Sequence, residues 1–338
     1  MDTKDKVRPR LVDVAREAGV SVSTASRALG KGSELIGAST RDHVRAVARR
    51  LGYQVNPIAR SLRLATTGAI GMVVPSISNP FFMELVEKVE HSLAARGLSL
   101  LLSDSRTSIT VEDQQLRSLE SGAVDGLLIV PCHQKYSAPA LERTSLAIPT
   151  IQLDRVVHSL PLPTVGVDDV HGMRAILDHL KATGATRIAM LANTGKDVSS
   201  DTRVAEVLAY APHIGLELRK EDCMECAFSV EAGASAVATL IEQSRLADAV
   251  VCLNDLLAIG AITQLRKSGV AVPEEVMVTG FDDIQFAALM RPSITTLRQP
   301  LENIAEAAVD ILFSGDLTAR HIAFQGELVI RESTAGQK

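Results

Sequence analysis

From Thr67 onward, short apolar runs alternate with longer segments of helical periodicity, and this alternation constrains the fold more than any other feature. Ala69–Val74 is a continuous apolar run, which is typical of a parallel strand buried on both faces. The next segment, residues 81–96, carries apolar side chains at helical spacing. Strands that alternate with helices predict an α/β fold built on doubly wound parallel sheets.

The pattern divides into two series, which predict two α/β lobes within residues 67–335. In the first series we expect strands at 69–74, 98–102, 126–130 and 149–153 and helices at 81–96 and 111–119. In the second we expect strands at 164–167, 187–191, 249–253 and 275–280 and helices near 172–182, 203–210, 230–243 and 256–267. The chain is expected to cross between the lobes near 155–163 and 282–298. Sheets of this kind bind ligands at the carboxyl ends of their strands, so a crevice between the lobes is expected to hold a ligand.

Residues 8–54 carry a different pattern, that of three short helices. The first has an apolar stripe at Leu11, Val14, Ala15 and Ala18. Gly19 suits its left-handed end, and Ser21 suits the N-cap of a second helix that ends before Gly30. The third has an apolar face at Val44, Val47, Ala48 and Leu51. This plan predicts an all-α helix-turn-helix domain whose second helix enters the DNA major groove, and a small protein-interaction module is the alternative.

Charge is distributed unevenly along the chain. Residues 1–63 hold 13 Lys and Arg against 6 Asp and Glu, which is a net charge of +7. Because the whole chain carries −5, the remainder carries −12. A basic segment on an acidic body indicates contact with a polyanion, although a solvated basic arm fits the charge equally well.

Residues 55–66 read as a short helix and linker between these two regions. Asn56 suits an N-cap, Pro57 suits the first helical position, and the segment is too short to be helical alone in water. Leu62 stands between Arg60 and Arg63. An apolar side chain flanked by basic ones suits insertion into the DNA minor groove.

Polar and aromatic residues follow several of the predicted strands. They are Asn79, Phe81, Phe82, Asp154, Arg155, Arg203, Phe228, Asn254, Asp282 and Gln299. Carboxylates, amides and guanidinium groups satisfy hydroxyl groups, and phenyl rings pack on the apolar faces of a sugar ring. The alternative is that strand-end Asp and Asn residues are helix caps, which is the interpretation we favour for Asp255 and Asp283.

Several classes of protein are not expected. No run of about 18 apolar residues predicts a membrane span, and the charged amino terminus does not resemble a secretory signal, so a cytoplasmic protein is expected. Cys223 and Cys226 form one CxxC without a second ligand pair, so neither a metal nor a cofactor is expected.

Two other functions compete with that of a DNA-binding regulator. A secreted sugar-binding protein would fit the body but not the basic amino-terminal region. An α/β sugar-processing enzyme could use Asp154 and Asp282 as an acid–base pair. We expect Arg155 and Arg203 to keep both carboxyls ionised, which favours binding over catalysis, and no catalytic motif is present.

The chain resembles the LacI family of bacterial transcription regulators over nearly its whole length. DVAREAGVSVSTASRAL, LGYQVNPIARSL, SNPFF, VPEEVMVTGFDD and TTLRQP match the family's signatures in order. The resemblance implies a repressor that binds a pseudo-palindromic, double-stranded DNA operator as a homodimer and responds to a small effector. It departs from the family at Gly30, where Asn is usual, at Gly37, where Ser is usual, and at Glu206, where Gly is frequent.

The resemblance also assigns roles to single residues. Base-reading positions match Val22, Ser23 and Arg27, and backbone-contacting positions match Ser21, Thr24, Ser26, Thr40 and Tyr53. The hinge helix matches residues 56–63, with Asn56 at its start and Ala59 beside the wedging Leu62. Effector-binding domains of this family are similar to periplasmic sugar-binding proteins, and the ligand positions of the ribose-binding representative match the ten strand-end residues named above. This implies a monosaccharide-sized effector.

Overall fold

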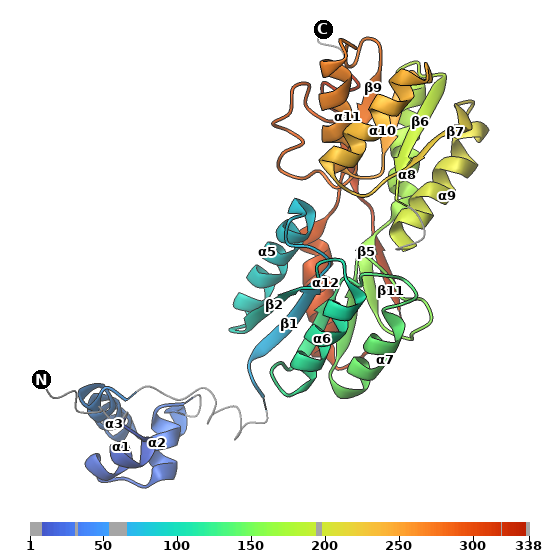
Figure 1. The fold of residues 1–338 in the computed structure, drawn as a ribbon. Helices are drawn as coiled ribbons and strands as arrows, with labels where there is room; N and C mark the ends of the chain where they lie inside the picture. Colours follow the sequence, from blue (N-terminus) through green and yellow to red (C-terminus); the bar gives the residue numbers. More distant parts are fainter. Residues whose placement is uncertain (1–8, 31–32, 54–65, 194–197, 319, 336–338) are drawn as a thin grey trace, which may run out of the picture. The chain divides into compact units, whose positions relative to one another are not determined.

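The computed structural model describes residues 9–30, 33–53, 66–193, 198–318 and 320–335. The chain forms two compact units, Met1–Thr67, which we term the head, and Gly68–Lys338, which we term the body (Figure 1). Within the described residues, no helix is both long and apolar enough to cross a lipid bilayer.

The head contains α1 (Leu11–Glu17), α2 (Val22–Ala28), the 3-10 turn η1 (Ser33–Leu35) and α3 (Ala38–Leu51). Gly19, with φ +63°, ends α1, and the Oγ of Ser21 accepts the amide hydrogen of Thr24 at 3.1 Å to begin α2. The small core consists of Val14, Ala15, Ala18, Ala25, Ala28, Val44, Val47 and Ala48. Alanine at five of these positions lets the helices approach closely. The predicted helix-turn-helix plan is confirmed.

The first lobe of the body is a six-stranded parallel sheet in the order β11-β5-β4-β3-β1-β2. Its strands are β1 (Ala69–Val74), β2 (Ser99–Asp104), β3 (Gly126–Ile129), β4 (Thr150–Leu153), β5 (Thr164–Val167) and β11 (His321–Phe324). Helices α5 (Pro80–Ala94) and α12 (Leu301–Ser314) pack on one face, and α6 (Ile109–Glu120) and α7 (Ala138–Ala147) pack on the other.

The second lobe is a four-stranded parallel sheet in the order β7-β6-β8-β9. Its strands are β6 (Arg187–Ala192), β7 (Glu217–Glu225), β8 (Ala249–Cys252) and β9 (Met277–Thr279). Helices α10 (Val230–Glu242) and α11 (Asp255–Lys267) cover one face, and α8 (Asp169–Ala182) and α9 (Val198–His213) cover the other. β10 (Thr296–Arg298) and β12 (Glu327–Val329) form an antiparallel ribbon that joins the lobes.

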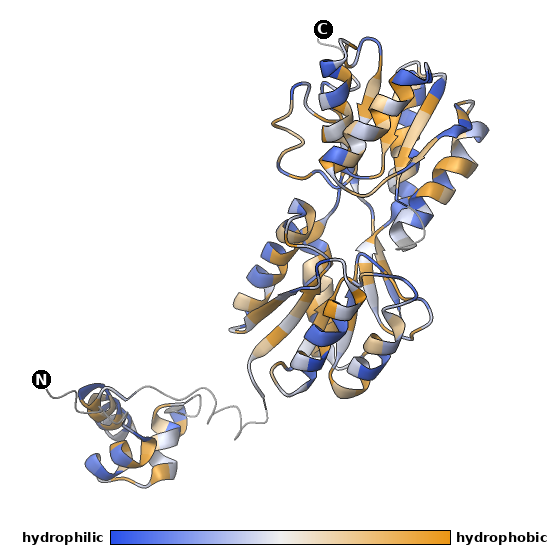
Figure 2. Cartoon of the chain, viewed as in Figure 1, coloured by the Kyte–Doolittle hydropathy of each residue, from blue (hydrophilic) through white to orange (hydrophobic). Residues whose placement is uncertain are grey.

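Burial and capping explain why these segments form these elements. The inner strands of both sheets are apolar along their length (Figure 2), and each large apolar side chain buried there contributes about 1.5–3 kcal/mol. A polar residue directly before a helix accepts a backbone hydrogen of its first turn, as Asn79, Asp168, Ser229 and Asn254 do. The α/β architecture with two doubly wound lobes is therefore as predicted.

Strand β5 corrects the predicted division between the lobes. Residues 164–167 were expected to begin the second series, but β5 pairs with β4 and β11 in the first sheet. The first crossing consequently lies between β5 and α8, not at 155–163. The chain crosses again after β10 and a third time between β11 and β12. Six elements of the body were not predicted from the sequence: α7, α12, β7, β10, β11 and β12.

Helices α10 and α11 pack unusually closely, and two glycines permit it. A Cβ on Gly260 would lie 2.0 Å from the carbonyl oxygen of Val230, and one on Gly233 would lie 2.4 Å from that of Leu257. Both obstacles are backbone atoms, which side-chain rotation cannot move. Only glycine fits at these two positions.

Candidate functional site

The surface of α2 presents the residues that were expected to contact DNA. Ser21, Ser23 and Arg27 are exposed, and Val22 is 44% exposed although it is apolar. The Oγ of Ser21 lies 2.8 Å from the hydroxyl oxygens of both Ser23 and Thr24. The first turn of α2 therefore offers a cluster of hydroxyl groups beside a short apolar side chain.

The remaining expected DNA contacts surround this surface or fall outside the described residues. Ser26, Thr40 and Tyr53 are half-buried, and Tyr53 packs against the core of the head. Gly37 is the N-cap of α3. Asn56, Ala59 and Leu62, with the rest of the predicted hinge helix, lie outside the described residues.

In the body, Arg203 on α9 is the centre of a buried polar network. Its side chain is only 6% exposed, and its Nε bonds the Oδ1 of Asp169 at 2.7 Å. Its Nη1 donates to the carbonyl oxygen of Leu253 at 2.9 Å and lies 4.0 Å from the Oδ1 of Asp282. Its guanidinium group stacks 3.6 Å from the ring centroid of Phe281. Burial lowers the pKa of Arg203, but the carboxylates of Asp169, Asp282 and Asp154 outweigh it, and the net shift is upward.

Asp282 and Gln299 come from two chain segments that run side by side. The Nε2 of Gln299 donates to the Oδ1 of Asp282 at 2.8 Å, and both residues are buried. The Oε1 of Gln299 is buried without a hydrogen-bond partner. An unpaired buried acceptor is costly, so a donor group of a bound molecule would be favoured at this position.

The first lobe contributes an aromatic and charged group to the same region. The rings of Phe81 and Phe82 meet edge to face at 5.2 Å, and the guanidinium of Arg155 lies 5.5 Å from the ring centroid of Phe82. The Nε of Arg155 lies 3.9 Å from the Oδ2 of Asp154. The Oγ of Ser199, on α9, donates to the carbonyl oxygen of Asp154 at 2.6 Å and thereby links the lobes.

These contacts bring seven of the ten strand-end residues into one chain of neighbours, which we term the interlobe cluster. Its members are Phe81, Phe82, Asp154, Arg155, Arg203, Asp282 and Gln299. Asn79 and Asn254 use their side-chain oxygens as helix N-caps beside the cluster. Phe228 packs against the two hydrophobic clusters of the second lobe.

Three interpretations of single residues need correction. Asp282 was expected to stay ionised beside Arg203, but burial raises its pKa well above the ordinary value and outweighs the opposing effect of the guanidinium. Asp255 and Asp283 are structural, as expected, but they are not helix caps. Asp255 accepts the amide hydrogen of Ile284 at 2.8 Å, and Asp283 binds two arginines.

Glu206, where the family frequently has Gly, lies on α9. Its Oε1 accepts from the Nε of Arg174 at 2.6 Å, so it joins α9 to α8. Asp169 and Ser199 were not among the predicted residues. Asp169 lies two residues after the strand at 164–167, so its position carried the signal used for the other candidates.

The described residues contain no group of three or more side chains placed to hold a metal ion. Cys223 and Cys226 remain free thiols, and burial raises the pKa of Cys226 to about 11, which makes it unreactive. A separate depression of about 530 Å3 is lined by Arg266, Val272, Pro273, Arg291 and Glu332. These residues precede β9 and β10 or follow β12, whereas the interlobe cluster lies at the carboxyl ends of the strands.

Comparison with known proteins identifies both units. Residues 10–56 match the family of bacterial regulatory proteins of the lacI type, and residues 67–315 match the periplasmic binding proteins and sugar-binding domain of the LacI family. A transcriptional regulator encoded in the aml 5′ region of Streptomyces limosus is 33% identical, with 97% of this chain and 95% of the relative covered.

Comparison with solved structures also finds regulators of this family. The Lac repressor dimer bound to operator and the anti-inducer ONPF superposes with a TM-score of 0.86 at 26% identity, covering 97% of this chain and 99% of that one. A complex of the transcriptional regulator CelR with cellobiose superposes with a TM-score of 0.72 at 27% identity, covering 96% of this chain and 100% of that one. Proteins of this family are regulators and not enzymes. The chain therefore belongs to the LacI family of bacterial regulatory proteins and is a DNA-binding transcriptional regulator.

Proposed function

We propose that this regulator is a repressor that binds a pseudo-palindromic operator as a homodimer and changes its operator affinity when an uncharged monosaccharide binds between the lobes. The Lac repressor, which is similar along 97% of this chain, binds its operator as a dimer. Two heads held over two half-sites explain why such operators are nearly symmetric. The protein then acts where the chromosome lies, in the cytoplasm.

On the DNA side, the exposed surface of α2 supports the proposal. Val22, Ser23 and Arg27 would read bases in the major groove, since an arginine can make two hydrogen bonds to guanine. The backbone contacts would come from Ser21, Thr24, Ser26, Thr40 and Tyr53. The hinge residues Asn56, Ala59 and Leu62 would make the remaining DNA contacts, with Leu62 inserted into the minor groove.

The single observation that carries the effector proposal is the buried polar group of Arg203, Asp282 and Gln299. It places a guanidinium, a carboxyl and an amide within a few ångströms of one another, next to the phenyl rings of the first lobe. This combination binds the hydroxyl groups and the apolar face of a sugar. Asn79, Asp154, Arg155, Phe228 and Asn254 complete the proposed contacts. The cellobiose complex of CelR shows that a similar chain binds a sugar.

The charges of the interlobe cluster favour an uncharged sugar over a sugar phosphate. Its arginines, Arg155 and Arg203, are matched by the carboxylates of Asp154 and of the neighbouring Asp169. The guanidinium of Arg203 already bonds a carboxylate and a backbone carbonyl. A phosphate group would have to displace these partners and would lie near three carboxyl groups.

A ligand screen by thermal unfolding of the purified dimer tests the effector proposal. Each free sugar is paired with its phosphate, for example D-ribose with ribose 5-phosphate, and nucleosides and purines are included. A ligand at about 100 times its Kd stabilises the folded protein by about 2.7 kcal/mol. We expect a free sugar to raise the Tm and to change operator affinity in a gel-shift assay. A response to sugar phosphates or purines alone would contradict the proposal.

A further inference from the structure

One segment of the second lobe, Asp282–Gln285, is held by both lobes at once. Asp282 and Asp283 have φ of +110° and +56°, which are unusual for residues with a side chain. A backbone of this kind persists only where surrounding contacts hold it. Those contacts account for every amide hydrogen in the segment.

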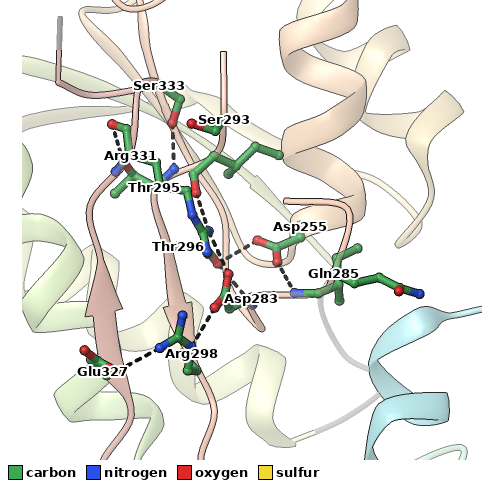
Figure 3. Close-up of polar contacts among 12 residues, drawn as sticks. Asp255, Asp283, Gln285, Ser293, Thr295, Thr296, Arg298, Glu327, Arg331 and Ser333 are labelled. Atoms are coloured by element: carbon green, nitrogen blue, oxygen red, sulfur yellow. Dashed lines mark hydrogen bonds and ion pairs between the residues drawn. The ribbon is translucent and has the colours of Figure 1, made fainter. Parts of the chain in front are cut away.

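The second lobe and its connecting strand bind the first three amides. The amide of Asp282 donates to the carbonyl oxygen of Leu297 at 2.9 Å, and that of Asp283 donates to the Oγ1 of Thr296 at 3.3 Å. The amide of Ile284 donates to the Oδ2 of Asp255 at 2.8 Å. The other oxygen of Asp255 accepts a hydrogen bond from the Oγ1 of Thr296 at 2.6 Å (Figure 3). The carboxyl group of Asp255 therefore binds both the segment Asp282–Gln285 and strand β10.

The first lobe binds the fourth amide and the neighbouring side chain. The amide of Gln285 donates to the Oε1 of Glu84, on α5, at 2.9 Å. The side chain of Ile284 is only 1% exposed and belongs to the hydrophobic cluster of the first lobe. Ile284 therefore has its amide fixed by the second lobe and its side chain buried with the first.

Electrostatics explain how Glu84 can approach this segment. The carboxylate of Asp283 raises the pKa of Glu84, although burial of the Glu84 carboxyl is the larger cause. Asp283 is compensated by Arg298 at 2.8 Å and by Arg331 at 2.7 Å, and Arg298 also binds Glu327 at 3.1 Å (Figure 3). Arg298 lies on β10, and Arg331 follows β12 by two residues. The two arginines reduce the repulsion between Asp283 and Glu84.

We propose that Glu84 and the segment Asp282–Gln285 form an interlobe clasp that positions Asp282 against α5 and so couples effector binding to the arrangement of the lobes. Helix α5 begins with Phe81 and Phe82 of the interlobe cluster and carries Glu84 one turn later. A single helix therefore carries effector contacts and the clasp. Glu84 is a positioning residue, and this role rests on the proposed effector function.

Hydrogen–deuterium exchange of the full-length dimer tests the clasp without any ligand. Glu84→Ala should accelerate exchange of the segment Asp282–Gln285 at least about tenfold, because an amide loses its acceptor. Glu84→Gln keeps an acceptor oxygen and should restore protection. Glu87→Ala is the matched control, since that carboxylate is exposed on the same helix and pairs with Lys88. Wild-type exchange in Glu84→Ala, or equal acceleration in Glu87→Ala, would overturn the proposal.

A titration with D-ribose provides the functional comparison. Glu84→Ala should bind D-ribose about tenfold more weakly than the wild type, and Glu84→Gln should bind it nearly as well. Unchanged binding by Glu84→Ala would refute the positioning role. If wild-type protein does not bind D-ribose, the titration is repeated with the sugar that raises the Tm in the screen, and the exchange experiment decides independently whether the clasp exists.

Discussion

Arg27 is the residue on which the proposed base recognition most depends. It is exposed on α2, and arginine distinguishes guanine from other bases by two hydrogen bonds, which contribute about 1–3 kcal/mol of discrimination. Arg27→Ala should relax the base preference at one position of each half-site, as measured by selection from a randomised operator library. Arg16→Ala, an exposed change on α1, serves as the control. An unchanged selection profile for Arg27→Ala would refute the assignment.

Asp282 should matter for effector binding and not for operator affinity. Asp282→Asn keeps the size of the side chain at a position with positive φ, which asparagine tolerates better than most residues. The substitution replaces one carboxyl oxygen beside Arg203 with an NH2 group, so we expect effector binding to weaken at least tenfold, corresponding to about 1.5 kcal/mol or more. Calorimetric titration measures this loss. Asp316→Asn, at an exposed pair with Arg320, should change nothing.

Asp255 makes stability depend on pH in an unusual direction. Its carboxyl is buried against Thr296, Ile284 and Asp283, and burial raises its pKa to about 7. The folded state therefore binds this proton more tightly than the unfolded state does. Its contribution to stability is complete at low pH and is lost as pH rises through about 7.

Asp255→Asn should remove this dependence. The Tm of the wild type should fall relative to that of Asp255→Asn as pH rises from 5 to 8, because only the wild type must ionise a buried group. Thermal unfolding of both proteins across this range measures the difference. A constant difference in Tm would show that Asp255 does not titrate there.

At the scale of elements, the close crossing of α10 and α11 should reverse the change in stability that helix propensity predicts for a Gly→Ala substitution. Gly→Ala in an open helix stabilises by about 1 kcal/mol. At Gly260 the added methyl group would overlap the carbonyl oxygen of Val230, so Gly260→Ala should destabilise the body by about 1–3 kcal/mol. Chemical denaturation measures the change, with Ser235→Ala on exposed α10 surface as the control. A more stable Gly260→Ala protein would contradict the close packing.

Local patterns in the sequence predicted most elements, but they did not predict which sheet each strand joins. The apolar run at Ala69–Val74 and the caps at Ser21 and Asn254 are local signals, and the structure has the corresponding elements. β5 joins its sheet by pairing with β4 and with β11, which lies more than 150 residues later in the chain. No spacing or propensity within residues 164–167 contains that information. Helix α12 has clear apolar periodicity and could have been predicted.

The interlobe cluster could likewise be predicted only in part from the sequence. Strand ends and family resemblance identified residues that lie together, including Asp154, Arg203 and Asp282. They did not show that Asp169 would take the best hydrogen bond of Arg203. Asp169 is the first residue of α8, and the burial that raises the pKa of Asp282 depends on the packing of both lobes, which no local sequence pattern contains.

At the scale of the whole molecule, the two proposed sites should respond differently to salt. The head carries a net charge of +7, and DNA binding releases counterions from neutralised phosphates. Operator affinity should fall by about 10³–10⁵ between 50 and 200 mM salt if 6–10 phosphates are contacted. Binding of an uncharged sugar should hardly change. Fluorescence anisotropy with labelled operator and calorimetry with D-ribose measure the two slopes, and a flat operator slope would contradict the proposed backbone contacts.

The order of the strands also bears on how the protein is made. Both lobes need the end of the chain: α12 and β11 complete the first, and the amide of Val278 in the second donates to the carbonyl oxygen of Ser333. The core of the head, by contrast, is complete once residue 53 has been synthesised. At about 5–20 residues per second, the ribosome needs tens of seconds to supply the difference. The helix-turn-helix can therefore fold well before either lobe can. Chaperones that bind the growing chain during this interval bind a body that is not yet complete.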